Sequence, residues 1–169
     1  MTKENKNAKA RYLYDMLVRK LTLKGMTIST MESCTGGLIA SLITDNEGVS
    51  NIIKGAFVTY SNEAKIKQGV PSEVIEQYGV YSPETAVAMA NACRETYDSD
   101  IGIGVTGTLG RIDKRNKSDS INKVYFAIVT PDGTFFYDID VSEYRSRRTK
   151  KMSVALAVAH FAHQLIKWD

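Results

Sequence analysis

A polar stretch in the first quarter of the chain concentrates groups that could perform nucleophilic chemistry. Residues 31–37, MESCTGG, place the carboxylate of Glu32, the hydroxyl of Ser33 and the thiol of Cys34 beside two glycines. Apolar segments on either side predict a strand before this stretch and a helix after it, so the free N–H groups of the helix would point into the turn. The pattern predicts either an anion or oxyanion site or an ordinary helix start capped by Ser33 or Thr35.

A second polar cluster follows the segment 55–60, whose β-branched and aromatic residues predict a strand. Ser61 or Asn62 can cap the short helix that comes next, which places Lys65 in its first turn. A cation there faces the positive end of the helix dipole, and burial would lower its pKa further, as a general base requires. The alternative is an ordinary solvated lysine that falls early in the helix.

A third cluster follows residues 100–105, a short segment that is apolar on both faces and is typical of a central parallel strand. Thr106 and Gly107 come directly after it. Ligands of open α/β sheets bind at the carboxyl ends of the strands. Three polar clusters in the same structural position therefore predict one site.

The other elements must hold these clusters in place, and their patterns predict an α/β fold. Apolar spacing predicts long helices at both ends of the chain, a serine followed by proline marks another helix start, and a Pro-Asp-Gly turn joins two strands into a hairpin. We expect residues 1–7 to be disordered and the charged segment 111–120 to be a mobile loop. The predicted ranges are helices over 8–23, 82–97 and 145–168, and strands over 26–29, 124–130 and 134–141.

Composition narrows the class of protein. With 169 residues, 43% of them hydrophobic, the chain can bury the core of one domain. A net charge of +3 is too mildly basic to indicate nucleic acid binding, and no apolar run reaches the length of a membrane span. Cys34 and Cys93 lack zinc or disulfide spacing, which favours a reducing cytoplasm, and no cluster of residues predicts a metal site.

Four segments together resemble the CinA C-terminal domain family of competence/damage-inducible proteins. They are ESCTGG at 32–37, GAFVTYSNEAK at 55–65, GVYS at 79–82 and VTG at 105–107, and the likeness extends over roughly residues 8–166. The resemblance implies a single-domain three-layer α/β/α sandwich with a mixed, largely parallel sheet. It also implies a homodimer that hydrolyses a pyridine nucleotide, nicotinamide mononucleotide, to nicotinate mononucleotide and ammonia without a cofactor.

Amide hydrolysis needs a nucleophile, a base and donors for the oxyanion, and the resemblance distributes these roles. Ser33 is the expected nucleophile, with Cys34 as the competing one, and Lys65 is the base. Tyr60 and Thr106 are expected to assist catalysis, and backbone N–H groups near the first glycines to bind the oxyanion. The expected substrate-binding residues are Glu32, Cys34, Thr35, Gly36, Gly37, Asn62, Gly107 and, for the phosphate, Arg145.

Two departures from the family pattern keep an alternative function open. Residues 108–111 read Thr-Leu-Gly-Arg where the family usually has Ile-Ala-Gly-Pro, and Thr149 stands where it tends to carry an arginine. Proline and paired glycines fix loop geometry, so their loss reshapes the wall that faces the substrate. The alternatives are a nucleotide-binding or partner-binding module without turnover, and an amidase for a related small amide.

Overall fold

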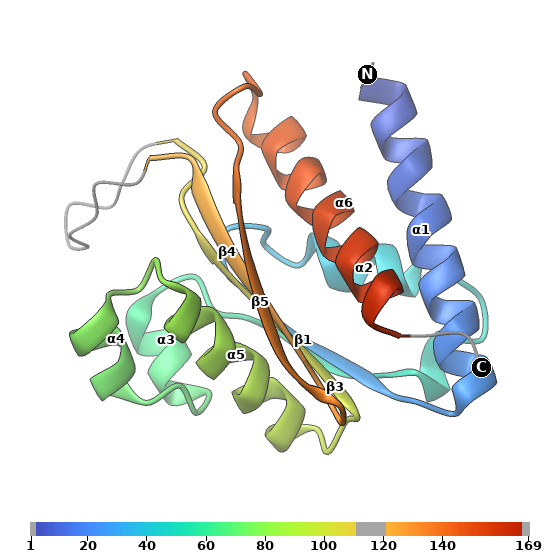
Figure 1. The fold of residues 1–169 in the computed structure, drawn as a ribbon, viewed down its shortest axis with the longest axis horizontal. Helices are drawn as coiled ribbons and strands as arrows, with labels where there is room; N and C mark the ends of the chain where they lie inside the picture. The colour runs from blue at the N-terminus through green and yellow to red at the C-terminus, as the bar shows by residue number, and fades with distance from the viewer. Residues whose placement is uncertain (1–2, 111–120, 167–169) are drawn as a thin grey trace.

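The computed structural model describes residues 3–110 and 121–166, which form one sheet with helices on both faces (Figure 1). A short 3-10 turn at Val49–Asn51 precedes the second strand. The helices are α1 (Lys3–Lys24), α2 (Leu38–Thr44), α3 (Asn62–Lys67), α4 (Ser72–Tyr78), α5 (Pro83–Thr96) and α6 (Arg147–Leu165). The strands are β1 (Ile28–Glu32), β2 (Ile53–Val58), β3 (Ile101–Gly107), β4 (Lys123–Thr130) and β5 (Gly133–Asp140).

The strand order is β2-β1-β3-β4-β5. Strand β1 pairs in parallel with both β2 and β3, whereas β4 is antiparallel to β3 and to β5. Every strand except β4 therefore points the same way, which confirms the predicted mixed, largely parallel sheet. All residues of β1 and β3 are buried, as expected of central parallel strands, and exposure alternates along the two edge strands.

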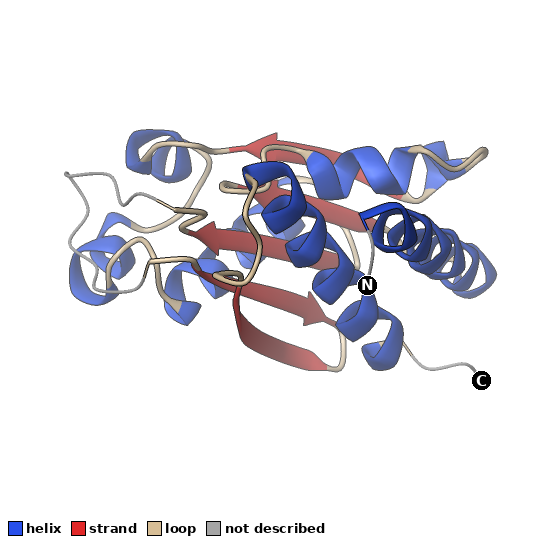
Figure 2. Cartoon of the chain, turned by 90° about the horizontal axis from the view of Figure 1, so that it is seen from above, coloured by secondary structure: helices blue, strands red, loops and turns tan. Residues whose placement is uncertain are grey.

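Helices α1, α2 and α6 cover one face of the sheet, and α3, α4 and α5 lie on the other (Figures 1 and 2). The larger apolar core lies between the sheet and the first group of helices. On the second face α5 packs directly on the backbone of β3, where a Cβ at Gly102 or Gly104 would overlap carbonyl oxygens of the helix. The three layers hold the carboxyl ends of β1, β2 and β3 together at one edge.

Most predicted elements are confirmed, with three differences at their ends. The first strand begins later than predicted and runs to Glu32. Its polar residues Ser29, Thr30 and Glu32 are all buried, because helices cover both faces of the sheet (Figure 1). Residues 3–7, which were expected to be disordered, lie in the first turns of α1. The last helix begins at Arg147, capped by Ser146, so Arg145 lies outside it. The predicted loop 111–120 lies outside the described residues.

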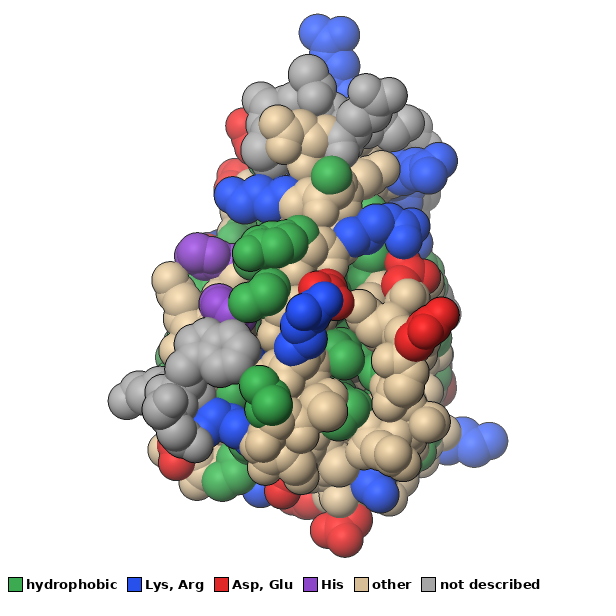
Figure 3. All heavy atoms as spheres, turned by 90° about the vertical axis from the view of Figure 1, so that its right-hand side faces the viewer, with side chains coloured by type: hydrophobic (Ala, Val, Ile, Leu, Met, Phe, Trp, Pro, Cys, Tyr) green, Lys and Arg blue, Asp and Glu red, His purple; other side chains and the backbone are tan. Residues whose placement is uncertain are grey.

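The face that carries α1 and α6 mixes apolar, basic and histidine side chains (Figure 3). Within residues 3–110 and 121–166, no helix is long and apolar enough to cross a bilayer. The same residues contain no group of three or more histidine, cysteine or carboxylate side chains that could hold a metal ion.

Candidate active site

Ser33 is the first residue after β1, and both neighbouring strands fix its backbone. Its N–H donates to the carbonyl oxygen of Val105 in β3 at 3.0 Å. The preceding carbonyl, that of Glu32, accepts from the N–H of Thr59 just beyond β2 at 2.8 Å. Ser33 as a residue is 7% exposed. These two backbone hydrogen bonds hold it at the edge of the sheet where three parallel strands end.

Lys65 reaches Ser33 from α3. Ser61 caps this helix by accepting from the N–H of Ala64 at 3.1 Å, as the sequence predicts. The Nζ atom of Lys65 lies 3.2 Å from the Oγ atom of Ser33 and 2.9 Å from the carbonyl oxygen of Thr59. Because Lys65 is only 1% exposed, it is not an ordinary solvated lysine.

Burial lowers the pKa of Lys65 to about 8, against smaller opposing effects of Cys34 and Glu63. The ordinary pKa of a lysine side chain is about 10.4. At physiological pH the neutral amine of Lys65 is therefore far more populated than that of an exposed lysine. In its neutral form Nζ can donate to the Thr59 carbonyl and accept the proton of the Ser33 hydroxyl. The pair therefore has the geometry and the protonation behaviour of a nucleophile and its base.

Glu32 was expected to bind substrate, but its side chain turns to the start of α2 instead. Its carboxyl oxygens accept hydrogen bonds from the N–H groups of Gly37, Ile39 and Ala40 at 3.0, 3.2 and 2.8 Å. The side chain is fully buried. It therefore occupies the N-terminus of α2 itself, and the anion site that the sequence suggested there is filled by the protein's own carboxyl group.

Replacing Glu32 with alanine is expected to lower the free energy of unfolding by about 2 to 4 kcal/mol. The change leaves buried N–H groups at the start of α2 without their acceptor, and each such hydrogen bond to a carboxylate contributes about 1.5–3 kcal/mol. Denaturant unfolding followed by circular dichroism measures the difference. Glu76→Ala, on the exposed side of α4, is the matched control and should change stability by less than about 0.5 kcal/mol. A loss for Glu32→Ala no larger than that of the control would contradict the capping role.

Cys34 is a poor competitor for the role of nucleophile. Burial, followed by the effect of Glu32, raises the pKa of its thiol to about 12. Lys65 and Arg147 lower that pKa by smaller amounts. The thiolate is the reactive form of cysteine, so Cys34 is inert at neutral pH and belongs to the core.

The turn between Ser33 and α2 is built on two left-handed glycines, with φ of 63° at Gly36 and 87° at Gly37. The Gly36 N–H donates to the Ser33 carbonyl at 3.0 Å, so it is not available to an oxyanion. The hydroxyls of Thr35 and Thr59 are buried and have no hydrogen-bond partner among the described residues. Buried hydroxyls normally find a partner in protein, water or ligand, which makes these two candidates for contacting substrate.

Thr106 and Gly107 close the site on the β3 side. The Thr106 hydroxyl donates to the carbonyl oxygen of Val80 at 2.7 Å and is fully buried, which fixes the segment before α5 against the sheet. A Cβ at Gly107 would overlap β4. They were predicted to follow the strand, but they are the last two residues of β3, and the hydrogen bond of Thr106 indicates a structural role.

Tyr60 and Asn62 follow β2 but do not join the Ser33/Lys65 pair. The Tyr60 side chain is 63% exposed, and its hydroxyl accepts from the Nη2 atom of Arg147 at 3.0 Å. No hydrogen bond links Tyr60 to Ser33 or Lys65 among the residues that the structure describes. Asn62 is the half-buried first residue of α3.

The first turns of α6 bring two further cations to this edge. The Nζ atom of Lys151 lies 2.9 Å from the position that a Cβ would occupy at Gly36. Arg147, four residues earlier on the helix, reaches Tyr60. Arg145, the expected phosphate ligand, is exposed ahead of the helix and makes no hydrogen bond or ion pair with the described residues.

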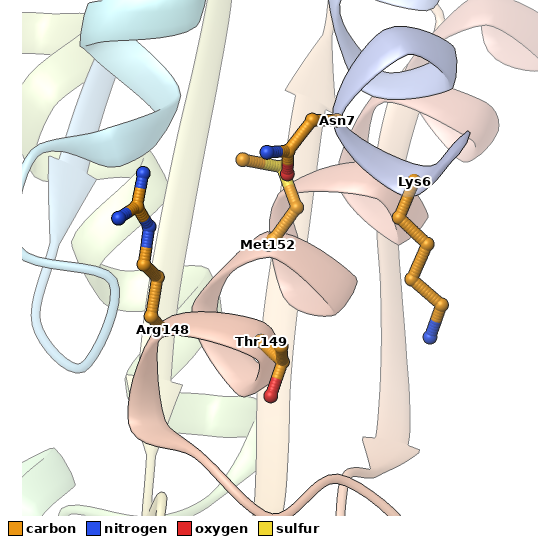
Figure 4. Close-up of a pocket in the computed structure, with 5 residues that line it drawn as sticks. All are labelled: Lys6, Asn7, Arg148, Thr149 and Met152. Atoms are coloured by element: carbon orange, nitrogen blue, oxygen red, sulfur yellow. The ribbon is translucent and has the colours of Figure 1, made fainter. Parts of the chain in front are cut away.

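A separate pocket lies between the beginnings of α1 and α6 (Figure 4). Its lining does not include Ser33 or Lys65. Thr149, which replaces the arginine of the family pattern, is part of this lining rather than of the Ser33 turn. The lining residues are Lys6, Asn7, Arg148, Thr149 and Met152.

Sequence reasoning missed Thr59, and among the basic residues 145–151 it assigned a role to Arg145 alone rather than to Arg147 or Lys151. Thr59 stands inside the GAFVTYSNEAK segment, one position past the strand, and was passed over because it lacks a titratable group. Arg147 and Lys151 are four residues apart, and helical spacing from the Ser146 cap would have placed them on one face. That signal was present in the sequence, but only the three-dimensional contact with Gly36 and Tyr60 connects it to the site.

Comparisons with known proteins agree with this architecture. The family model described as "CinA C-terminal domain" matches residues 11–165. A competence-damage inducible protein of Caldanaerobacter subterraneus subsp. tengcongensis is 39% identical over 140 residues, which are 82% of this chain and 34% of that protein. A CinA-like protein of Fervidobacterium nodosum is 36% identical over 141 residues, 83% of this chain and 33% of that protein. The chain thus spans about a third of the length of these relatives.

Solved structures show the same fold over nearly the whole chain. The competence/damage inducible protein CihA of Agrobacterium tumefaciens aligns with a TM-score of 0.84 and 26% identity, covering 94% of this chain and 96% of that one. A CinA superfamily protein of Enterobacter cloacae aligns with a TM-score of 0.86 and 21% identity, covering 94% of this chain and 92% of that one.

Proposed function

The chain belongs to the CinA C-terminal domain family, and we propose that it is an amidase that hydrolyses nicotinamide mononucleotide to nicotinate mononucleotide and ammonia. The observation that carries this proposal is the 3.2 Å contact between the buried Lys65 amine and the Ser33 hydroxyl. A serine activated by a lysine is an established form of nucleophile and base. The choice of substrate rests on the family resemblance, and the proposed mechanism rests on the Ser33/Lys65 contact.

The first half of the reaction acylates Ser33. Neutral Lys65 takes the hydroxyl proton while Oγ attacks the carboxamide carbon, and the carbonyl oxygen becomes an oxyanion. The Lys65 ammonium then gives this proton to the amide nitrogen. The carbon–nitrogen bond breaks, ammonia leaves, and the nicotinoyl ester of Ser33 remains.

The second half repeats the same proton transfers with water. Lys65 takes a proton from a water molecule, which attacks the ester carbon, and the ammonium returns the proton to Oγ as the ester bond breaks. The carboxylic acid of nicotinate mononucleotide loses its proton to solvent. Lys65 therefore serves both halves as base and acid, and no metal is needed to balance any step.

In this proposal the hydroxyl group of Thr35 donates a hydrogen bond to the oxyanion. The Gly36 N–H already donates within the turn, and the first N–H groups of α2 are held by Glu32. The buried Thr35 hydroxyl has no such engagement among the described residues. Thr35 is two residues from Ser33 in the sequence, and a donor that contacts the oxyanion strengthens its hydrogen bond as negative charge develops.

Ammonia release from nicotinamide mononucleotide by the purified protein is the direct test, measured with a coupled dehydrogenase assay. Turnover abolished by Ser33→Ala supports the proposal. Saturable binding of the nucleotide without any ammonia would instead favour the binding module without turnover. A panel of related amides separates the proposed substrate from another small amide.

The proposal also predicts the pH dependence. The reactive form of Lys65 is the neutral amine, so kcat/KM should rise about tenfold per pH unit below the Lys65 pKa of about 8 and level off above it. Rates measured from pH 6 to about 9.5 in buffers of constant ionic strength give the profile. A rate that is flat across this range, or that falls as pH rises from 6 to 8, would show that neutral Lys65 is not required.

A further inference from the structure

Thr59 and Ser33 occupy neighbouring positions on the same face of the sheet. Strands β1 and β2 are parallel, with Glu32 paired to Val58, and the ladder continues because the Thr59 N–H donates to the Glu32 carbonyl at 2.8 Å. The side chains of Glu32 and Val58 both lie at the start of α2. Successive side chains of a strand point to opposite faces. Thr59 therefore points to the other face, where Lys65 of α3 meets Ser33.

Two threonine hydroxyls flank Ser33 in this row across the sheet, and they differ in what they bind. On the β3 side the neighbour of Ser33 is Thr106, since the preceding residues of the two strands are paired. Its hydroxyl already donates to a backbone carbonyl. Thr59 is 2% exposed, and its Oγ1 atom has no hydrogen-bond partner within residues 3–110 and 121–166. Neighbouring strands lie about 4.8 Å apart, so a group bound at Ser33 can supply the partner that a buried hydroxyl normally has.

Thr59 is also joined directly to the base. Its carbonyl oxygen accepts from the Nζ atom of Lys65 at 2.9 Å, and the same Nζ atom lies 3.2 Å from the Oγ atom of Ser33. In the proposed reaction this amine exchanges protons first with the departing nitrogen and then with the attacking water, so each must lie beside Nζ in its turn. Thr59 borders that place, whereas Thr35 belongs to the turn that leads to α2.

We propose that the Thr59 hydroxyl binds the carboxamide nitrogen in the first half of the reaction and the attacking water in the second, an assignment that rests on the proposed amidase activity. In the first half one N–H of the carboxamide donates to Oγ1 while the Lys65 ammonium protonates the nitrogen, and ammonia leaves. In the second half the water donates one O–H to Oγ1 and gives its other proton to Lys65 as its oxygen bonds to the ester carbon. Thr59 keeps its own proton throughout.

Methanol competes with water for the ester of Ser33 and isolates this hydrogen bond. Its single O–H is needed by Lys65, so methanol has no second hydrogen to donate to Thr59. In Thr59→Val the water loses an acceptor and methanol loses nothing. The ratio of methyl ester to free acid formed from nicotinamide mononucleotide in dilute methanol should therefore rise about tenfold in Thr59→Val and change less than about twofold in Thr59→Ser. Liquid chromatography with mass spectrometry measures both products.

The product ratio separates this role from a structural one. If the valine only displaced Lys65, attack by water and by methanol would slow together and the ratio would not move. Thr35→Val should likewise slow both reactions and leave the ratio unchanged, because an oxyanion donor serves both nucleophiles. Thr134→Val makes the same substitution at an exposed position of β5 and should change neither the rate nor the ratio.

Thermal unfolding checks that the comparison is made on folded protein. Thr59→Val should keep the melting temperature of the unmodified protein, because the hydroxyl that it removes has no partner in the described part of the chain. Thr59→Ala gives the same comparison if valine is not accepted at this buried position. If the unmodified protein releases no ammonia, the amidase proposal and this assignment both fail. If it releases ammonia but the ratio in these variants does not exceed that of the unmodified protein, including the case in which no methyl ester forms, the assignment of Thr59 is wrong and the amidase proposal stands.

Discussion

Ser33→Ala is expected to lower kcat for ammonia release from nicotinamide mononucleotide by about 10⁴-fold or more, because the alanine methyl group cannot form the acyl ester. The fold should survive the change. The Ser33 N–H donates to Val105, and the neighbouring Glu32 carbonyl accepts from Thr59, so the backbone fixes Ser33. Within residues 3–110 and 121–166, the hydrogen bond of its hydroxyl is the one with the Lys65 amine. Steady-state kinetics combined with thermal unfolding of the variant separates lost chemistry from lost structure.

Two comparisons make this result decisive. Ser41→Ala changes an exposed serine on α2 and should keep full activity. Cys34→Ala addresses the competing nucleophile, and activity that survives in Cys34→Ala but not in Ser33→Ala assigns the ester to the hydroxyl. The reverse pattern would give the role to the thiol despite its raised pKa. Intact-mass analysis of protein quenched during turnover would show the added nicotinoyl nucleotide on the reactive residue.

The fold was largely predictable because its determinants are local. Strand β3 is apolar on both faces, helix α5 begins with a serine cap and proline, and a Pro-Asp-Gly turn joins β4 to β5. Each pattern has one common structural solution. The boundary of β1 was harder to predict, because Ser29, Thr30 and Glu32 are polar and their burial depends on the helices that cover both faces of the sheet.

The Ser33/Lys65 pair was predictable for a related reason. Both residues follow parallel strands that the fold places next to each other, so their sequence positions already imply a meeting at one edge. The lowered pKa of Lys65 was expected from helix position and burial, and the structure gives burial as the largest cause.

The roles of the surrounding polar residues could not be predicted in the same way. Glu32 could equally have served substrate or protein, and the choice depends on whether its side chain turns toward the α2 backbone, which it does. The Thr106 hydroxyl donates to the carbonyl oxygen of Val80, a residue 26 positions away in the sequence. Such long-range hydrogen bonds follow from packing and leave no periodic signal in the sequence.

The position of Glu32 also explains how one turn can be reactive without being an anion site. The positive end of α2 is neutralised by a carboxyl group from the strand that precedes it. Glu32 and Ser33 are adjacent residues, so the hydrogen bonds from Glu32 to the start of α2 also fix the position of Ser33.

Lys65→Arg is expected to lower kcat by about 10³-fold or more, although it preserves the positive charge. A guanidinium can still donate to the Thr59 carbonyl and to Ser33, but it stays protonated at every accessible pH and cannot accept the hydroxyl proton. General base catalysis contributes about 10²- to 10⁴-fold, and here the same amine acts in both halves of the reaction. Ammonia release at about pH 9, above the Lys65 pKa of about 8 and therefore where the amine is mostly neutral, gives the largest contrast.

The charge-preserving change distinguishes a base from an electrostatic role. If Lys65 only stabilised the oxyanion, arginine would support activity within about tenfold, and the rate of the unmodified protein would fall rather than rise as the pH passes the Lys65 pKa of about 8. If it is the base, Lys65→Ala should be rescued by added ethylamine in proportion to the concentration of the free amine, whereas Ser33→Ala should not. Lys67→Arg, on the exposed side of the same helix, controls for the substitution itself. Rescue that depends on neutral amine and on an intact Ser33 would place proton transfer at the 3.2 Å contact between the two side chains.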